Sequence, residues 1–119
     1  MTSRRSKAVR NDDCLRVCVA MLTGRPVSRV PHFVRKHRGR WDWHLRRWCD
    51  RCGYTFVMHS GSRGLRAWFG RRVRRWIEVG KTRDGEGHAI VLGHKGTVWD
   101  GGHPLRSSTT TIVILRGRC

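Results

Sequence analysis

The apolar residues of this 119-residue chain change their spacing once along its length, and that change constrains the fold. Residues 14–22 and 42–52 carry apolar side chains at the three- and four-residue intervals of one helix face. Asp12 or Asp13 is suited to cap the first helix, and Gly53 to end the second. The first half of the chain is therefore predicted to form helices.

Beyond Gly53 the chain consists of short runs of apolar and β-branched residues, which are typical of strands. These runs cover residues 54–58, 76–79, 88–92, 97–99 and 110–115. Gly93 and Gly96 separate two of the runs and predict an antiparallel hairpin. Helices followed by such strands predict an α+β domain, in which N-terminal helices pack on a C-terminal antiparallel β-sheet.

The chain is long enough for one domain. Residues 1–10 are basic and polar, and we expect a flexible arm there, followed by a single domain over residues 11–119. No apolar stretch approaches the roughly 20 residues that cross a bilayer, so no membrane partner is expected. The arm lacks the apolar segment of a secretory signal, and five cysteines cannot all pair with one another. Both features predict a reducing, cytoplasmic location.

The chain carries 26 lysine and arginine residues against 8 acidic residues, which gives a formal net charge of +18. An excess of this size attracts anionic partners over long distances. Nucleic acid is one such partner, bound through an arginine-rich surface, and an acidic peptide or protein substrate is another. A basic surface that is only solvated has the same composition, so charge alone leaves these alternatives open.

Three residues of different types form the candidate catalytic set: Cys14, His88 and Asp100. Cys14 opens the first predicted helix, where unpaired N–H groups and the helix dipole favour a thiolate. His88 begins a predicted strand, and Asp100 follows the next one. A nucleophile, a base and a carboxylate that orients the base make up the common arrangement for acyl transfer.

The hairpin between His88 and Asp100 decides whether these two side chains meet. If Leu92 pairs with Gly96 across a three-residue loop, His88 lies opposite Asp100 on one face of the sheet. A loop of two or four residues shifts the register by one and sends the two side chains to opposite faces. The sequence is compatible with both registers, and only the first one forms a catalytic pair.

Several short segments resemble the papain-like cysteine peptidase superfamily. They are Asp13-Cys14, Gly87-His88-Ala89 and Trp99-Asp100, with the Leu-Thr-Gly-Arg-Pro-Val and Val-Pro-His-Phe segments at residues 22–27 and 30–33. The chain is most similar to the bacteriocin-processing peptidase domains and their small bacterial and phage relatives, over about residues 11–104. This resemblance implies a papain-like fold and a thiol hydrolase that cleaves a peptide, isopeptide or amide bond. Cys14 would be the nucleophile, His88 the general base and acid, and Asp100 the residue that orients His88.

The chain departs from this superfamily in one respect. Those enzymes usually place a glutamine shortly before the cysteine, where its amide helps to hold the oxyanion, and this chain contains no glutamine. Asn11 is the only asparagine and lies three residues before Cys14. Its side-chain amide and the Cys14 backbone N–H are therefore the candidate oxyanion donors.

Two further groups of residues leave alternatives open. Cys49 and Cys52 form half of a common zinc-ligand pattern, but both fall on the apolar face of a predicted helix. Burial is therefore expected, and neither a metal nor another cofactor is predicted.

The six tryptophans fall into two groups, predicted core residues and residues that could contact a ligand. Three are predicted to be core residues (Trp48, Trp76 and Trp99), and three are available to a ligand such as single-stranded nucleic acid (Trp41, Trp43 and Trp68). The alternative function is thus a non-enzymatic basic binding protein on a degenerate papain-like fold.

Overall fold

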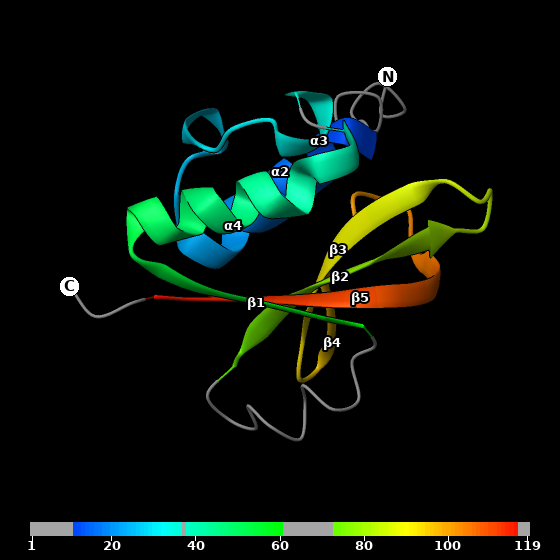
Figure 1. The fold of residues 1–119 in the computed structure, drawn as a ribbon. Helices are drawn as coiled ribbons and strands as arrows, with labels where there is room; N and C mark the ends of the chain where they lie inside the picture. The colour runs from blue at the N-terminus through cyan, green and yellow to red at the C-terminus, as the bar shows by residue number, and fades with distance from the viewer. Residues whose placement is uncertain (1–10, 37, 61–72, 117–119) are drawn as a thin grey trace.

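The computed structural model describes residues 11–36, 38–60 and 73–116, which form three α-helices and one five-stranded β-sheet. The helices are α2 (Asn11–Thr23), α3 (Phe33–Lys36) and α4 (Trp41–Cys52), with 3-10 turns at Val27–Arg29 and Arg38–Arg40. The strands are β1 (Tyr54–Ser60), β2 (Arg75–Thr82), β3 (Gly87–Gly93), β4 (Gly96–Trp99) and β5 (Leu105–Arg116). Figure 1 shows the helices together on one side of the sheet.

The sheet has the strand order β1-β5-β2-β3-β4, and every neighbouring pair is antiparallel. The predicted α+β class, with N-terminal helices and a C-terminal antiparallel sheet, is confirmed. The longest strand, β5, pairs with β1 on one side and with β2 on the other. Among the described residues, no helix is long and apolar enough to span a membrane. The predicted arm at residues 1–10 lies outside the described residues.

Helix α2 begins earlier than the sequence predicted. Asp12 and Asp13 were expected to precede the helix as caps, but both lie within its first turn, because the helix already includes Asn11. Its other end is as expected. The Thr23 hydroxyl donates to the Val19 carbonyl at 2.8 Å, and Gly24, at φ 72°, donates its N–H to the Ala20 carbonyl at 2.8 Å. Acidic residues in the first turn are still favourable to the helix dipole.

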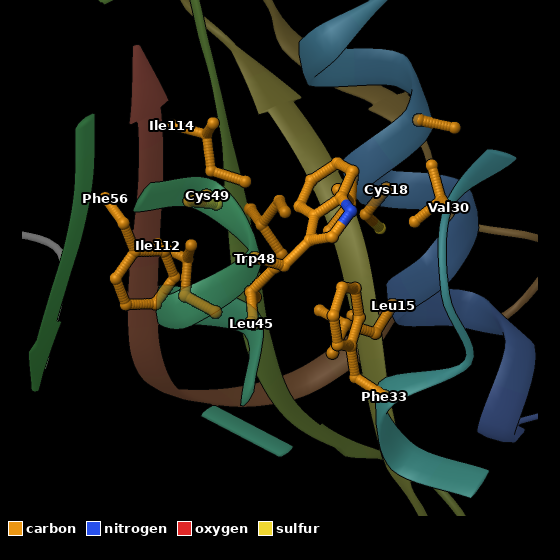
Figure 2. Packing of buried hydrophobic residues seen from close by; sticks show 14 of the residues in the cluster. Leu15, Cys18, Val30, Phe33, Leu45, Trp48, Cys49, Phe56, Ile112 and Ile114 are labelled. Carbon is orange, nitrogen blue, oxygen red and sulfur yellow. The ribbon is translucent and has the colours of Figure 1, made fainter. Parts of the chain in front are cut away.

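The main core lies between the helices and the sheet. Leu45, Trp48 and Cys49 of α4 are buried in it, as their spacing predicted. Figure 2 shows side chains of α2 and α4 pointing toward each other and toward strand residues such as Ile112 and Ile114. Each fully buried large apolar side chain contributes about 1.5–3 kcal/mol, so this layer is a main source of stability.

The opposite face of the sheet is also apolar. Val73, Trp76 and Val113 are buried there, with Leu92 and Leu115 packed against them. Because both faces of the central strands are covered, their sequences are continuously apolar and do not alternate with polar residues. This explains why β3 and the end of β5 contain almost uninterrupted apolar runs.

The β3–β4 hairpin corrects the predicted register. Leu92 pairs with Thr97 and Gly93 with Gly96, so the turn has two residues and the predicted Leu92–Gly96 pair is wrong. The register then shifts, so that Val91 pairs with Trp99. This shift inserts one extra residue into β4. The two-residue turn alone would have placed His88 and Asp100 on opposite faces of the sheet, and the extra residue returns them to the same face. A bulge of this kind leaves no sequence signal that a simple count of loop residues can detect.

Candidate active site

The Cys14 thiol lies against the beginning of β3. Cys14 is in the first turn described for α2 and is only 3% exposed. Its Sγ accepts a hydrogen bond from the Ala89 backbone N–H at 3.3 Å. A backbone donor and a helix N-terminus both favour negative charge on sulfur. The main chain at residues 88–89 is therefore held directly beside the thiol, with the Ala89 N–H directed at the sulfur.

The His88 ring is buried at the same place, with only 2% of the residue exposed. Its Nε2 lies 2.6 Å from the main-chain carbonyl oxygen of Asp100. A carbonyl oxygen can only accept, so Nε2 must carry the proton and donate it. In the neutral ring Nδ1 is then unprotonated, and it is buried with no hydrogen-bond partner among the described residues. A general base needs an unprotonated nitrogen within reach of the proton that it removes, and Nδ1 is the unprotonated nitrogen of His88.

The Asp100 side chain does not hold His88 in this structure. Its Oδ1 accepts the Gly102 N–H at 2.8 Å, while its carbonyl accepts both His88 Nε2 and the His103 N–H, the latter at 3.1 Å. The physical reason is local turn chemistry. Gly101 and Gly102 have φ of 64° and 85°, and an aspartate before such a turn bonds the backbone two residues on. The orienting contact predicted for the carboxylate is thus made by the backbone of the same residue.

A polar network, which the sequence analysis did not predict, fixes the first turn of α2. Arg16 Nε donates to the Val30 carbonyl at 2.6 Å, and Arg16 Nη1 lies 2.6 Å from His32 Nε2. Since arginine can only donate, His32 Nε2 accepts and Nδ1 carries the proton, 3.1 Å from Asp13 Oδ1. The network joins the residues on either side of Cys14 to the segment at residues 30–32. Its one sequence signal was His32 in the Val-Pro-His-Phe segment.

The rings of two neighbours flank His88. The Trp99 centroid lies 6.3 Å from the His88 centroid, and the His103 ring stands perpendicular to His88 at 5.8 Å. No pattern in the sequence pointed to a role for His103. The contact brings an exposed, titratable side chain to the edge of the buried site.

Two other cysteines are unsuited to act as nucleophiles. Burial raises the pKa of Cys18 well above its usual value, and negative charge on the neighbouring Cys14 raises it further. Burial likewise raises the pKa of Cys49 to about 12, with smaller contributions from Cys52 and Asp50. Both side chains therefore remain neutral thiols near pH 7, and neutral thiols are poor nucleophiles.

The Cys49–Cys52 pair is in the last turn of α4. Cys49 is fully buried in the apolar core with Leu45, whereas Cys52 is half-buried. Over residues 11–36, 38–60 and 73–116, no cluster of three or more histidine, cysteine or acidic residues could hold a metal ion. The described part of the chain thus supplies no further ligands to complete a zinc site at this pair.

The predictions for Asn11 and for the tryptophans are only partly confirmed. Asn11 is in α2, but its side chain lies outside the described part of the structure, as does all of Trp68. Trp48 and Trp76 are buried and Trp99 packs against the core, as predicted. Trp41, expected to be available to a ligand, is half-buried against the core, whereas Trp43 is 43% exposed.

No protein-family model matches this chain, and no curated protein or solved structure shows significant similarity to it. The function must therefore be argued from the geometry of the site.

Proposed function

We propose that this chain is a papain-like thiol hydrolase that cleaves a peptide, isopeptide or amide bond. One observation carries the proposal: the Ala89 N–H bonds Cys14 Sγ, next to a histidine whose Nε2 is held by the Asp100 carbonyl. A thiol at a helix start, beside a buried imidazole of fixed tautomer, is the minimum apparatus for acyl transfer through a thioester.

The reaction follows from the tautomer. His88 Nδ1 takes the proton of the Cys14 thiol, and the thiolate attacks the substrate carbonyl carbon to give a tetrahedral oxyanion. The imidazolium then returns that proton to the leaving amine as the C–N bond breaks, which leaves a thioester on Cys14. His88 next removes a proton from water, whose oxygen attacks the thioester, and returns it to the departing sulfur.

The Asp100 carbonyl sets the tautomer of His88 without supplying a full negative charge. A carbonyl dipole stabilises an imidazolium less than a carboxylate would, so the thiolate–imidazolium pair depends more on the α2 N-terminus and the Ala89 N–H. For the oxyanion we propose the Cys14 backbone N–H and the Asn11 amide. Loss of one such donor typically lowers the rate by about 10²–10³.

Site-resolved alkylation tests the nucleophile. We expect iodoacetamide to modify Cys14 faster than Cys18, Cys49 or Cys52 at pH 7, as measured by mass spectrometry, although Cys14 is only 3% exposed. Cys14→Ala should abolish the fast phase, and Cys18→Ala, the matched control one helical turn away, should retain it. His88→Gln should slow the fast phase by at least about tenfold, because the thiol loses its base. Faster labelling of any other cysteine would overturn the assignment.

A second candidate function rests on a different surface. Trp43 is exposed, and the guanidinium groups of Arg40 and Arg47 lie 5.1 and 4.9 Å from its ring centroid. Stacked arginine and tryptophan side chains bind single-stranded nucleic acid without base specificity. A binding protein of this kind would hold a fluorescent oligonucleotide in a salt-dependent manner, lose affinity in Trp43→Ala and be unaffected by Cys14→Ala.

A further inference from the structure

A cationic hollow lies one side chain away from His88. Its volume is about 740 Å³. Its walls come from residues 82–84, at the end of β2 and in the turn after it, and from residues 102–106, before and at the start of β5. Figure 1 shows the β2–β3 hairpin and the beginning of β5 at the same end of the sheet. A concavity of this size is typical of sites that enclose part of a ligand.

The charged groups of the hollow are mostly basic. Arg83 comes from one wall, Arg106 and His103 come from the other, and Asp84 is the only acidic residue in the lining. Convergence of arginines from two separate segments distinguishes this place from the generally basic surface. Guanidinium groups bind carboxylates through paired, charge-assisted hydrogen bonds, which favours an anionic group in the hollow.

Backbone contacts hold the two walls in place. Thr82 pairs with Leu105 across β2 and β5. The Thr82 N–H donates to the Glu86 carbonyl at 2.9 Å, and the Gly85 N–H donates to the Thr82 carbonyl at 2.9 Å. The hollow is therefore built from a closed turn on one side and a strand start on the other. The backbone of both walls is thus ordered before a ligand binds, so the ordering cost is confined to the exposed arginine side chains.

The hollow and the candidate active site share one loop. The Asp100 carbonyl accepts hydrogen bonds both from His88 Nε2 and from the His103 N–H. The His103 ring lines the hollow and also stands 5.8 Å from the His88 ring. A chain bound at Cys14 and His88 would thus meet the hollow within a residue or two of the reacting carbonyl.

We propose that this hollow is a substrate subsite for an acidic side chain, with Arg83 and Arg106 as the groups that bind the carboxylate. The inference rests on the proposed hydrolase function and extends it by naming the substrate class, a peptide with aspartate or glutamate near the cleaved bond. Arg83 and Arg106 determine specificity and take no part in the chemical steps.

Peptidyl acyloxymethyl ketones provide the test, because they alkylate a nucleophilic cysteine at a rate that depends on the peptide. A matched set with glutamate or glutamine at each position is reacted with the wild-type chain and with Arg83→Gln/Arg106→Gln. At one position we expect glutamate to react at least tenfold faster than glutamine with the wild type, and about equally fast with the double variant. Equal rates for glutamate and glutamine at every position with the wild type would overturn the subsite.

Arg51→Gln/Arg116→Gln is the matched control. It removes the same charge from two exposed arginines near the opposite end of β5, roughly 33 Å from Arg106 at the usual rise per strand residue. An equal loss of preference in this control would assign the effect to net charge and refute the subsite. Iodoacetamide separates the two proposals. Normal labelling of Cys14 without a glutamate preference removes only the subsite, whereas absence of a fast phase at Cys14 removes the hydrolase itself.

Discussion

The Nε2 atom of His88 is hydrogen-bonded to the backbone carbonyl of Asp100 and not to its carboxylate, although the two residues are neighbours, as in a catalytic pair. The distance from Nε2 to the Asp100 carbonyl oxygen is 2.6 Å, and the carboxylate caps the following turn through the Gly102 N–H. This relationship changes what each part of Asp100 does. The backbone sets the tautomer of His88, and the side chain shapes the loop that carries His103.

The first prediction separates these two roles. Asp100→Asn keeps the carbonyl and an oxygen able to accept the Gly102 N–H, so we expect Cys14 alkylation and peptide cleavage to change by less than about fivefold. Where a carboxylate itself orients the base, the same substitution lowers kcat by about 10⁴, as in the serine protease triad. The measurement is the second-order rate constant of alkylation across pH 5–9. Asp50→Asn, at an exposed position of α4, is the control of equal charge. A loss of 10³ or more with Asp100→Asn would show that the carboxylate acts directly.

The position of Asp100 shows where sequence analysis reached its limit. Residue types and spacing brought Cys14, His88 and Asp100 into one hypothesis, and the structure places all three near the beginning of β3 and the end of β4. Which oxygen of Asp100 meets His88 depends on a β-bulge and on two glycines of positive φ. These features alter the direction of the chain without changing its apolar pattern, so periodicity alone does not reveal them.

The helices and the core were more predictable than the site. The apolar intervals in α4 predicted the burial of Leu45, Trp48 and Cys49 correctly, whereas Cys52, predicted on the same face, is only half-buried. Gly53 ends the helix in the left-handed conformation expected of it. In such a helix the local propensity and the pattern of burial favour the same structure, so the apolar spacing alone is enough to predict it. The contact between Arg16 and His32 joins residues 16 positions apart in the chain. No local rule predicts such a contact.

The second prediction concerns this contact. Arg16→Gln leaves the Val30 carbonyl and the Asp13–His32 pair without their common donor, so we expect a loss of about 1–3 kcal/mol in the free energy of unfolding. Urea denaturation followed by tryptophan fluorescence measures it. Arg35→Gln, which removes an exposed arginine of α3, should change the stability by less than about 0.5 kcal/mol. Equal effects of the two substitutions would mean that the Arg16 network does not stabilise the fold.

The third prediction follows from the buried thiol of Cys49. Burial raises its pKa from 9.0 to about 12, so between these pH values the unfolded chain loses this proton while the folded chain keeps it. The unfolded state then binds fewer protons, and the free energy of unfolding falls as pH rises, by at most about 1.4 kcal/mol per pH unit for one group. Below about pH 8, Cys49 makes no contribution to the pH dependence.

Urea titrations at pH 8 and pH 10.5, under reducing conditions, measure this slope. Cys49→Ala should be less stable at both pH values because it leaves a small cavity, but its stability should fall less between them. Cys52→Ala serves as the control, since Cys52 is only half-buried. An unchanged slope in Cys49→Ala would show that this thiol ionises in the folded protein much as it does in the unfolded chain.

The fourth prediction concerns a close approach of β2 and β5 at a glycine. Gly80 of β2 lies where the register against β5 shifts, and a Cβ atom placed on it would come within 1.8 Å of the Ser107 carbonyl oxygen. The atom in the way belongs to the backbone, so no side-chain rotation relieves the clash, and β2 and β5 must separate.

We expect Gly80→Ala to lower the free energy of unfolding by about 3 kcal/mol or more, at the upper end of what overpacking costs in protein interiors. Gly87→Ala, in the paired strand β3, is the control, because a Cβ atom there meets nothing within 4 Å. Its effect should stay within about 0.5 kcal/mol. The measurement is urea denaturation of both variants, with Cys14 alkylation as a second readout. Because the Thr82–Leu105 pair of the same two strands closes the cationic hollow, Gly80→Ala should also weaken any preference for glutamate probes. A Gly80→Ala variant as stable as Gly87→Ala would contradict the close approach of the two strands.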